Sequence, residues 1–367
     1  MSVFDPTLLL RPAIRNLRAF GAACNEFADR GDAQEWVKLD ASENPWPPQG
    51  AFATQCRANR YPESQPKILK ETLAGLYSVA PEQILLCRGS EELPDLLIRS
   101  LCQPTKEGVV VCPPTFGMYE VAAALNESPV RYVPLRADKG YDLDVDAILG
   151  GWQGHEKLII IPSPAVPLGH VMAFDQIKAV LDGLAERAIV AIDEAYIEFT
   201  EQEGWASYLD RYPHLVVMRT LSKAYALAGA RLGALIAAPK LVAKLVNVLP
   251  PYPLSAASIE VVRQALDASG IALLTERRAL LIKERQYMAQ NLKQSVWVEK
   301  LFPSDSNFLL VQTRDARAFV EHCRKYGIVV RNRHNDVSQT VRIGMGAPEE
   351  NDRVLVVLGV SAIRNKA

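Results

Sequence analysis

The chain has 367 residues, which is long enough for one large α/β domain and a smaller one, and its composition is ordinary for a globular protein. Its 41 basic and 42 acidic residues almost cancel, and no basic block carries interleaved aromatic residues, which argues against a nucleic-acid partner. The sequence also lacks an apolar run of membrane-spanning length and the features of a signal peptide, so we expect a cytoplasmic protein that does not enter a membrane.

Several kinds of site have no motif in this sequence. The six cysteines show no Cys-x-x-Cys spacing, so we expect reduced core residues rather than disulfides. The five histidines do not cluster with acidic residues, so we expect no metal. Neither a Gly-x-Gly-x-x-Gly fingerprint nor a Walker-type loop follows a strand, which argues against a nicotinamide or nucleoside triphosphate enzyme.

The N-terminal residues 1–47 are expected to form an arm that leads into the main domain. Helical spacing of apolar residues predicts helices at Pro12–Phe20 and Cys24–Arg30. A proline-rich loop follows, and its Asn44, considered alone, is most simply a turn residue. Tyr61 comes next, just before another proline, and is either a surface aromatic or a ligand contact.

Short apolar runs then alternate with helical patterns as far as residue 237. Runs that are apolar on both faces indicate a sheet covered on both sides, which is the doubly wound α/β arrangement. We expect this large domain to span residues 48–265 and to begin with an amphipathic helix at Gln65–Tyr77. The predicted strands are Ile84–Cys87, Gly108–Cys112, Val130–Pro134, Lys157–Pro162, Ala188–Ile192, Leu215–Arg219 and Leu232–Ala237.

Candidate ligand contacts follow three of these strands, at the sheet edge where open α/β sheets bind ligands. Ser90 and Glu91 open the next helix, so their amides either cap it or bind an anion. Phe116 lies on a proline turn and is either a core aromatic or a ring that stacks on a flat cofactor. Asp193 and Tyr196 are either a helix cap and a surface phenol, or groups that hold a heterocyclic nitrogen protonated and donate to the ring's oxygen.

The most informative stretch runs from Arg219 to Arg231, at the end of the sixth predicted strand. Lys223 lies there among apolar residues, so it can lose its proton and attack a carbonyl to form a Schiff base. Arg231, eight residues on, is suited to a bidentate hold on a phosphate. Together they suggest a pyridoxal phosphate site, although a Ser-Lys pair after a strand is more often a solvated turn.

The pattern changes after Pro253, and residues 266–367 are expected to form a small α/β domain. Arg331 and Arg342 fall on two of its short strands, where each is either an ordinary surface charge or a group that binds carboxylate or phosphate. The predicted elements are a helix at Thr275–Leu292, a strand at Phe308–Gln312, a helix at Asp315–Tyr326, strands at Ile328–Arg331 and Thr340–Gly344, and a helix from Pro348.

With these residues in place, the chain resembles the fold-type I pyridoxal phosphate enzymes, and among them the histidinol-phosphate aminotransferase family. The resemblance runs over nearly the whole chain. The motifs that carry it are Glu43-Asn44-Pro45, Arg60-Tyr61-Pro62, Arg88-Gly89-Ser90-Glu91-Glu92, Cys112 to Tyr119, Asp193 to Phe199, Ser222-Lys223 with Arg231, Pro251 to Ser255, Pro303 to Phe308, Gly327 to Arg331 and Val341-Arg342-Ile343.

The resemblance implies a homodimer with shared sites and a set of residue roles. Lys223 would be the Schiff-base lysine and proton shuttle. The other cofactor contacts would be Asp193 on the pyridine nitrogen, Tyr196 on the phenolic oxygen, Phe116 on the ring face, and Ser90, Glu91, Ser222, Arg231 and a neighbouring subunit's Tyr61 around the phosphate. The substrate contacts would be Arg342 on the carboxylate, Arg331 on the substrate's phosphate, and Asn44.

Two positions depart from the family pattern. Where the family has Asn-Asn-Pro-Thr-Gly, residues 165–169 read Ala-Val-Pro-Leu-Gly, so Val166 replaces the asparagine that donates to the cofactor's phenolic oxygen. A donor to a charged acceptor contributes roughly 1.5–3 kcal/mol, and its full loss from the transition state would slow the reaction roughly 10 to 100-fold. Phe116 stands where a tyrosine is common, which keeps the ring and drops its hydroxyl.

The function that the resemblance implies is transfer of an amino group between L-histidinol phosphate and the 2-oxoglutarate/glutamate pair, in histidine biosynthesis. Two alternatives stay open. One is another reaction of the same cofactor on a phosphorylated amino acid or amine, such as decarboxylation. The other is a paralogue that binds pyridoxal phosphate but turns over little and serves as a binding or regulatory protein, and Val166 keeps that alternative open.

Overall fold

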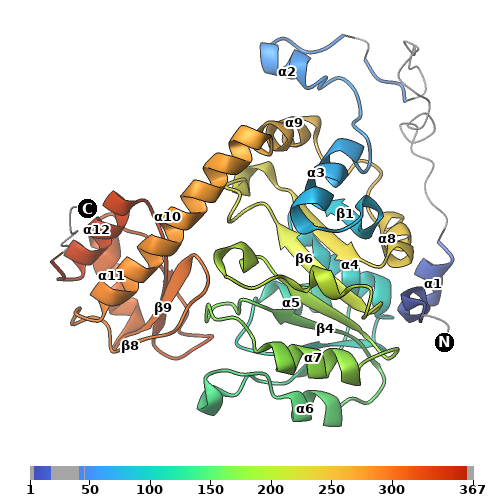
Figure 1. Ribbon diagram of the computed structural model, residues 1–367. Helices are drawn as coiled ribbons and strands as arrows, with labels where there is room; N and C mark the ends of the chain where they lie inside the picture. Colours follow the sequence, from blue (N-terminus) through green and yellow to red (C-terminus); the bar gives the residue numbers. More distant parts are fainter. Residues whose placement is uncertain (1–3, 18–40, 45, 362–367) are drawn as a thin grey trace.

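The computed structural model describes residues 4–17, 41–44 and 46–361. The helix expected at Cys24–Arg30 lies outside the described residues. The helix expected at Pro12–Phe20 begins at Pro12 as predicted but ends early, at Arg15, and forms α1 (Pro12–Arg15). The described residues form a seven-stranded sheet and a four-stranded sheet, each with helices packed on it (Figure 1).

The large sheet has the strand order β1-β7-β6-β5-β4-β2-β3. Strands β2 to β6 pair in parallel, whereas β7 runs antiparallel to both β6 and β1. All seven predicted strands are confirmed, with their ends shifted by two residues at most. Their bounds are β1 Ile84–Cys87, β2 Gly108–Val111, β3 Val130–Tyr132, β4 Glu156–Pro162, β5 Ile189–Asp193, β6 Leu215–Thr220 and β7 Gly233–Ala237.

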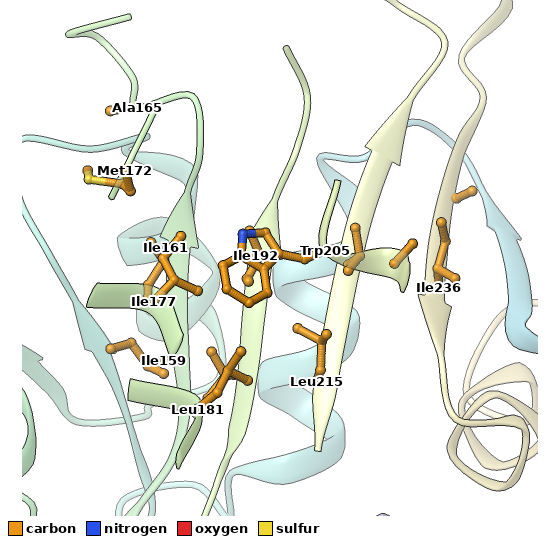
Figure 2. Packing of buried hydrophobic residues seen from close by; sticks show 14 of the residues in the cluster. Ile159, Ile161, Ala165, Met172, Ile177, Leu181, Ile192, Trp205, Leu215 and Ile236 are labelled. Carbon is orange, nitrogen blue, oxygen red and sulfur yellow. The ribbon is translucent and has the colours of Figure 1, made fainter. Parts of the chain in front are cut away.

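Both faces of the large sheet are buried, because successive strand residues point to opposite sides and almost all are apolar. In β4, Ile159 and Ile161 belong to one core cluster, and Leu158 and Ile160 to the other. Figure 2 shows the first cluster, in which Trp205 lies over the sheet. The helices of this part are α2 Ala51–Gln55, α3 Lys67–Tyr77, α4 Glu92–Leu101, α5 Met118–Leu125, α6 Val145–Gly150, α7 Phe174–Gly183, α8 Pro239–Val246 and α9 Ala256–Ala265.

The small sheet is antiparallel and has the strand order β10-β11-β9-β8. It has its own core, built around residues such as Phe319, Leu309 and Leu355. The bounds are α10 Ala268–Leu292, β8 Lys300–Leu301, β9 Phe308–Gln312, α11 Ala316–Lys325, β10 Arg331–Asn332, β11 Thr340–Gly344 and α12 Pro348–Val357.

Two boundaries of this part were predicted wrongly. Helix α10 begins at Ala268 rather than Thr275, because the side chain of Asp267 accepts a hydrogen bond from the Gly270 amide and caps the helix. Strand β10 begins at Arg331 rather than Ile328, because the Ile328 amide donates back to Cys323 and closes the end of α11.

The two sheets are joined by α10 and by a second, non-covalent contact. Helix α10 runs from α9, beside the large sheet, to the small sheet (Figure 1). In the loop before β9, the Asp305 amide donates to the Gly169 carbonyl at 2.8 Å, and the Asp305 carboxylate accepts from the Val171 amide at 3.0 Å. Ser306 Oγ also donates to the Gly169 carbonyl. The small sheet therefore contacts the loop that follows β4.

The described residues contain no helix that is both long enough and apolar enough to cross a membrane. They also contain no group of three or more acidic, histidine or cysteine side chains that could hold a metal ion.

Candidate active site

Three parallel strands place their following loops at one edge of the large sheet. Strands β4, β5 and β6 are neighbours and run in the same direction, so their carboxyl ends lie side by side. Asp193 is the last residue of β5, Val166 follows β4, and Lys223 follows β6. Three positions that are far apart in the sequence are thereby brought to one place.

Asp193 is held by two hydrogen bonds. Its Oδ2 accepts from the Tyr119 hydroxyl at 2.7 Å, and its Oδ1 accepts from the Ala195 amide at 3.1 Å. Burial raises the pKa of the Asp193 carboxyl, and the bond from Tyr119 works in the opposite direction. Sequence reasoning included Tyr119 in a motif but gave it no role. The available signal was its spacing, three residues after Phe116 at the start of a helix.

Lys223 lies beside the ring of Tyr196, with Nζ 5.7 Å from the ring centroid. Partial burial, and after it the positive charge of Arg342, holds the pKa of the Lys223 amine below its usual value. Tyr196 is buried, which raises its pKa, and its ring meets Phe308 edge-on at 5.2 Å between centroids. A lysine with a lowered pKa supplies neutral amine more readily, as a nucleophile or base requires.

The start of α4 offers free donors beside Arg231. Within the described residues, the amides of Ser90 and Glu91 have no hydrogen-bond acceptor, although both lie at a helix start. The Arg231 guanidinium pairs with the Glu91 carboxylate and donates to the Ala228 carbonyl at 3.1 Å. Gly89 has φ +81°, and a methyl group on it would collide with Arg231. The loop thus brings backbone amides close to an arginine, as anion sites do.

The neighbouring positions Ser222, Val166 and Phe116 differ in character. The Ser222 amide donates to Thr220 Oγ1 at 3.1 Å, which fixes the turn that leads to Lys223. Val166 is buried in an apolar cluster with Tyr196 and Phe308. Phe116 is half-buried and meets the Tyr119 ring edge-on at 5.7 Å between centroids.

The predicted arginines lie on paired strands of the small sheet. Arg331 and Arg342 are direct cross-strand partners, so both side chains project from the same face. The Arg342 guanidinium lies 5.1 Å from the Phe308 ring centroid, and its charge acts on Lys223. Sequence reasoning missed a third arginine, Arg333, whose Nε is 2.9 Å from Asp336 Oδ2.

Tyr61 and Asn44 do not join this group within one chain. Tyr61 is 53% exposed and stacks on Tyr252, with 4.2 Å between ring centroids and an angle of 15°. The Asn44 side chain accepts from the Trp46 amide at 3.0 Å, as a turn residue does. The described contacts place neither residue against Lys223.

Sequence reasoning also missed a buried ion cluster that includes Glu194, the residue after Asp193. Arg219, at the end of β6, has its Nε 2.7 Å from Glu194 Oε2 and its Nη1 3.1 Å from Glu198 Oε1. Burial opposes the charge on Arg219, but the two carboxylates still raise its pKa. Its guanidinium also lies 5.1 Å from the Tyr77 ring centroid. Because Glu194 follows Asp193 directly, the cluster links the loop after β5 to strand β6.

Comparison with known proteins places this arrangement in a family. A model of the class I and II aminotransferases matches residues 26–358. The histidinol-phosphate aminotransferase of Xylella fastidiosa (strain 9a5c) is 40% identical over 365 residues, which cover 98% of each chain. The chain therefore belongs to the class I and II aminotransferases, and within them to the histidinol-phosphate aminotransferase family. Enzymes of this class depend on pyridoxal 5'-phosphate, so this chain is a pyridoxal phosphate-dependent aminotransferase.

Solved structures show the same fold. The histidinol-phosphate aminotransferase of Sinorhizobium meliloti, in complex with pyridoxal-5'-phosphate, superposes with a TM-score of 0.75 at 22% identity, covering 87% of this chain and 88% of that one. The L-threonine-O-3-phosphate decarboxylase of Porphyromonas gingivalis gives a TM-score of 0.68 at 20% identity, covering 83% and 91%. The fold is therefore that of the fold-type I enzymes, and it does not by itself separate transaminases from decarboxylases.

The side chains at the strand ends fit this cofactor chemically. A phosphate needs amide and guanidinium donors, which Ser90, Glu91 and Arg231 provide. A basic ring nitrogen needs a carboxylate, and Asp193 is held in place by two donors. An aldehyde needs an amine with a lowered pKa, and Lys223 has one.

Proposed function

We propose that the chain transfers an amino group between L-histidinol phosphate and the 2-oxoglutarate/glutamate pair, as a cytoplasmic step of histidine biosynthesis. The observation that supports the proposal is that Lys223 and Asp193 follow or end neighbouring strands of the large sheet, near enough to Arg342 of the small sheet for its charge to act on Lys223. The 40% identity to a histidinol-phosphate aminotransferase over nearly the full chain supports this substrate.

In this proposal the large sheet's residues hold the cofactor, which when bound supplies an electron sink for the substrate's carbon. Lys223 holds the cofactor's aldehyde carbon and then moves a proton at its Nζ, for which a lowered pKa is suited. The other contacts would be Asp193 at the ring nitrogen, Tyr196 at the phenolic oxygen, Phe116 on the ring face, and Ser90, Glu91, Ser222 and Arg231 at the phosphate.

The small sheet's residues would bind the substrate. The charge of Arg342 acts on Lys223, and its planar guanidinium would donate two hydrogen bonds to the carboxylate of glutamate. Arg331 is paired with Arg342 across the strands, on the same face of the small sheet, and would bind the substrate's phosphate. Asn44 would contact the substrate from the N-terminal arm.

The alternatives predict different products from the same protein. A decarboxylase releases carbon dioxide from a phosphorylated amino acid, whereas a transaminase forms glutamate when histidinol phosphate and 2-oxoglutarate are supplied. A binding or regulatory paralogue forms neither, although it retains the cofactor's absorbance. We expect glutamate formation. Carbon dioxide release in its place, or a cofactor-loaded protein without turnover, would overturn the proposal.

Val166 gives a prediction specific to this chain. We expect Val166→Asn to raise the rate of transamination roughly 10-fold or more, because an amide here can donate to the cofactor's phenolic oxygen. The donor stabilises negative charge on that oxygen, so the absorbance titration of the bound cofactor should move to lower pH. Both effects are measured on the purified holoenzyme.

The matched control is Val166→Ala, which changes the volume at the same position without adding a donor. It should not reproduce either effect. An unchanged rate and titration in Val166→Asn, together with a structure that shows the amide within hydrogen-bonding distance of the cofactor, would contradict the prediction.

We also propose a homodimer in which Tyr61 serves the partner's site. Three aromatic side chains in and around α2 are strongly exposed, namely Trp46, Phe52 and Tyr61, and only Phe52 lies in the helix itself. Helix α2 extends away from the body of the chain (Figure 1). Exposed aromatic residues that gather on one segment are typical of a surface that another chain covers.

Subunit mixing tests the shared site. Lys223→Ala and Tyr61→Ala should each lower activity, but a mixed dimer contains one site with both residues intact. We therefore expect the mixture, after subunit exchange, to be more active than either variant alone. A monomer that is fully active at micromolar concentration, or a mixture without recovery, would count against the shared dimer.

The division into an arm (1–47), a large domain (48–265) and a small domain (266–367) remains a proposal. The two separate sheets support it, and each sheet has one core cluster that contains no residue of the other.

A further inference from the structure

Among the residues that the structure describes, Tyr119 is the only one whose side chain donates a hydrogen bond to the Asp193 carboxylate. The two residues are 74 positions apart and come from α5 and β5. The Tyr119 ring is fully buried, and its edge contact supports Phe116. One side chain therefore touches two of the groups proposed to contact the cofactor.

The two bonds to Asp193 together define its orientation. Each carboxylate oxygen has one protein donor, Tyr119 for Oδ2 and the Ala195 amide for Oδ1. A carboxylate held at both oxygens cannot rotate about its last bond without losing a hydrogen bond. Its remaining lone pairs are then presented in a fixed direction.

We propose that Tyr119 is a positioning residue, whose hydroxyl fixes the Asp193 carboxylate in the orientation that holds a proton on the cofactor's ring nitrogen. The inference rests on the role proposed above for Asp193. It adds a residue that acts only through Asp193 and does not touch the substrate.

The electrostatics of the site agree with this geometry. Burial raises the pKa of Asp193, and so does the neighbouring Glu194, whereas the bond from Tyr119 and the charge of Lys223 lower it. Tyr196 is the other acidic group that acts on Tyr119. Without the hydroxyl of Tyr119, Asp193 becomes more basic and competes with the ring nitrogen for their shared proton.

The test compares three variants of the holoenzyme. Tyr119→Phe removes the hydroxyl and keeps the ring that supports Phe116. Tyr212→Phe is the matched control, because the buried Tyr212 donates in the same way to Asp182 Oδ1 at 2.8 Å, at the end of α7. Asp193→Asn removes the carboxylate itself.

The direct measurement is the nitrogen magnetic resonance signal of cofactor labelled with ¹⁵N in its ring. We expect a protonated nitrogen in the wild type and in Tyr212→Phe, and a signal shifted toward the unprotonated nitrogen in Tyr119→Phe and Asp193→Asn. In Tyr119→Phe, kcat should fall about 10-fold with a smaller change in KM, and the acidic limb of its pH profile should move to higher pH.

Two results would overturn the inference and can be told apart. If Asp193→Asn shifts the signal but Tyr119→Phe matches Tyr212→Phe in signal and pH profile, Tyr119 is only structural. If Asp193→Asn also leaves the signal unchanged, the proposed role of Asp193 fails and the inference fails with it.

A second substitution covers the case in which Tyr119→Phe does not fold. A ring-fluorinated tyrosine at position 119 is a stronger hydrogen-bond donor of nearly the same shape. It should move the acidic limb of the pH profile to lower pH, opposite to Tyr119→Phe. An unmoved profile would count against the positioning role.

Discussion

Replacing Lys223 by alanine is expected to lower kcat for amino transfer by roughly 10⁴-fold or more, since proton transfer by a positioned group alone contributes roughly 10² to 10⁴-fold. The reason lies in the surroundings of the amine. Partial burial and the charge of Arg342 lower its pKa, which favours the neutral form that can react. Steady-state kinetics with histidinol phosphate and 2-oxoglutarate provide the measurement.

Lys223→Arg separates the two properties of this side chain. Arginine keeps the positive charge but cannot lose its proton at working pH, so we expect it to be as inactive as alanine. In the wild type, borohydride should fix a phosphopyridoxyl group on the peptide that contains Lys223. Finding the group on a peptide with a different lysine would overturn the assignment.

Replacing Arg219 by methionine is expected to lower the free energy of unfolding by about 3–5 kcal/mol, because Glu194 and Glu198 then remain buried without a cation. Chemical denaturation monitored by fluorescence measures the loss. The control is Arg317→Met, which breaks an exposed pair with Glu321 and should cost less than about 1 kcal/mol.

The pH dependence of this loss has a definite sign. Burial already raises the pKa of Glu198 in the folded chain, and removal of Arg219 raises it further. A carboxyl group whose pKa is higher in the folded than in the unfolded chain binds more protons when the chain is folded. Raising the pH removes those protons and therefore lowers the stability of the folded chain. Arg219→Met should therefore be more destabilised at about pH 8 than at about pH 5. Equal losses at both values would contradict a buried, uncompensated carboxylate.

The large sheet could be predicted because its strands are buried on both faces and leave an unbroken apolar signal, as in β4 (Glu156–Pro162). The small sheet was harder to predict. Its edge strand β10 has only two residues, Arg331 and Asn332, and both are exposed. The residues before this strand form the end of α11. Nothing in their polarity distinguishes a strand from a helix terminus.

The site shows a similar division. Groups that follow a strand directly, such as Asp193 and Lys223, could be placed from the sequence because the fold determines where parallel strands end. The partners that come from other elements could not. The hydroxyl of Tyr119, for example, comes from α5 and meets Asp193 of β5 across 74 positions of the sequence. Such contacts depend on tertiary packing, which local pattern does not encode.

The contact between Gly169 and Asp305 has a consequence for which molecules the enzyme can accept. Lys223 follows a strand of the large sheet, whereas Arg331 and Arg342 lie on strands of the small one, so in the proposed function the two ends of a substrate would contact different sheets. The distance between the two sheets would then determine which substrate length fits. That distance depends on α10, a helix about 38 Å long at 1.5 Å per residue, and on the hydrogen bonds from Asp305 to the loop after β4. Selection for a longer or shorter substrate could therefore act on residues 304–306 without altering any group that touches it.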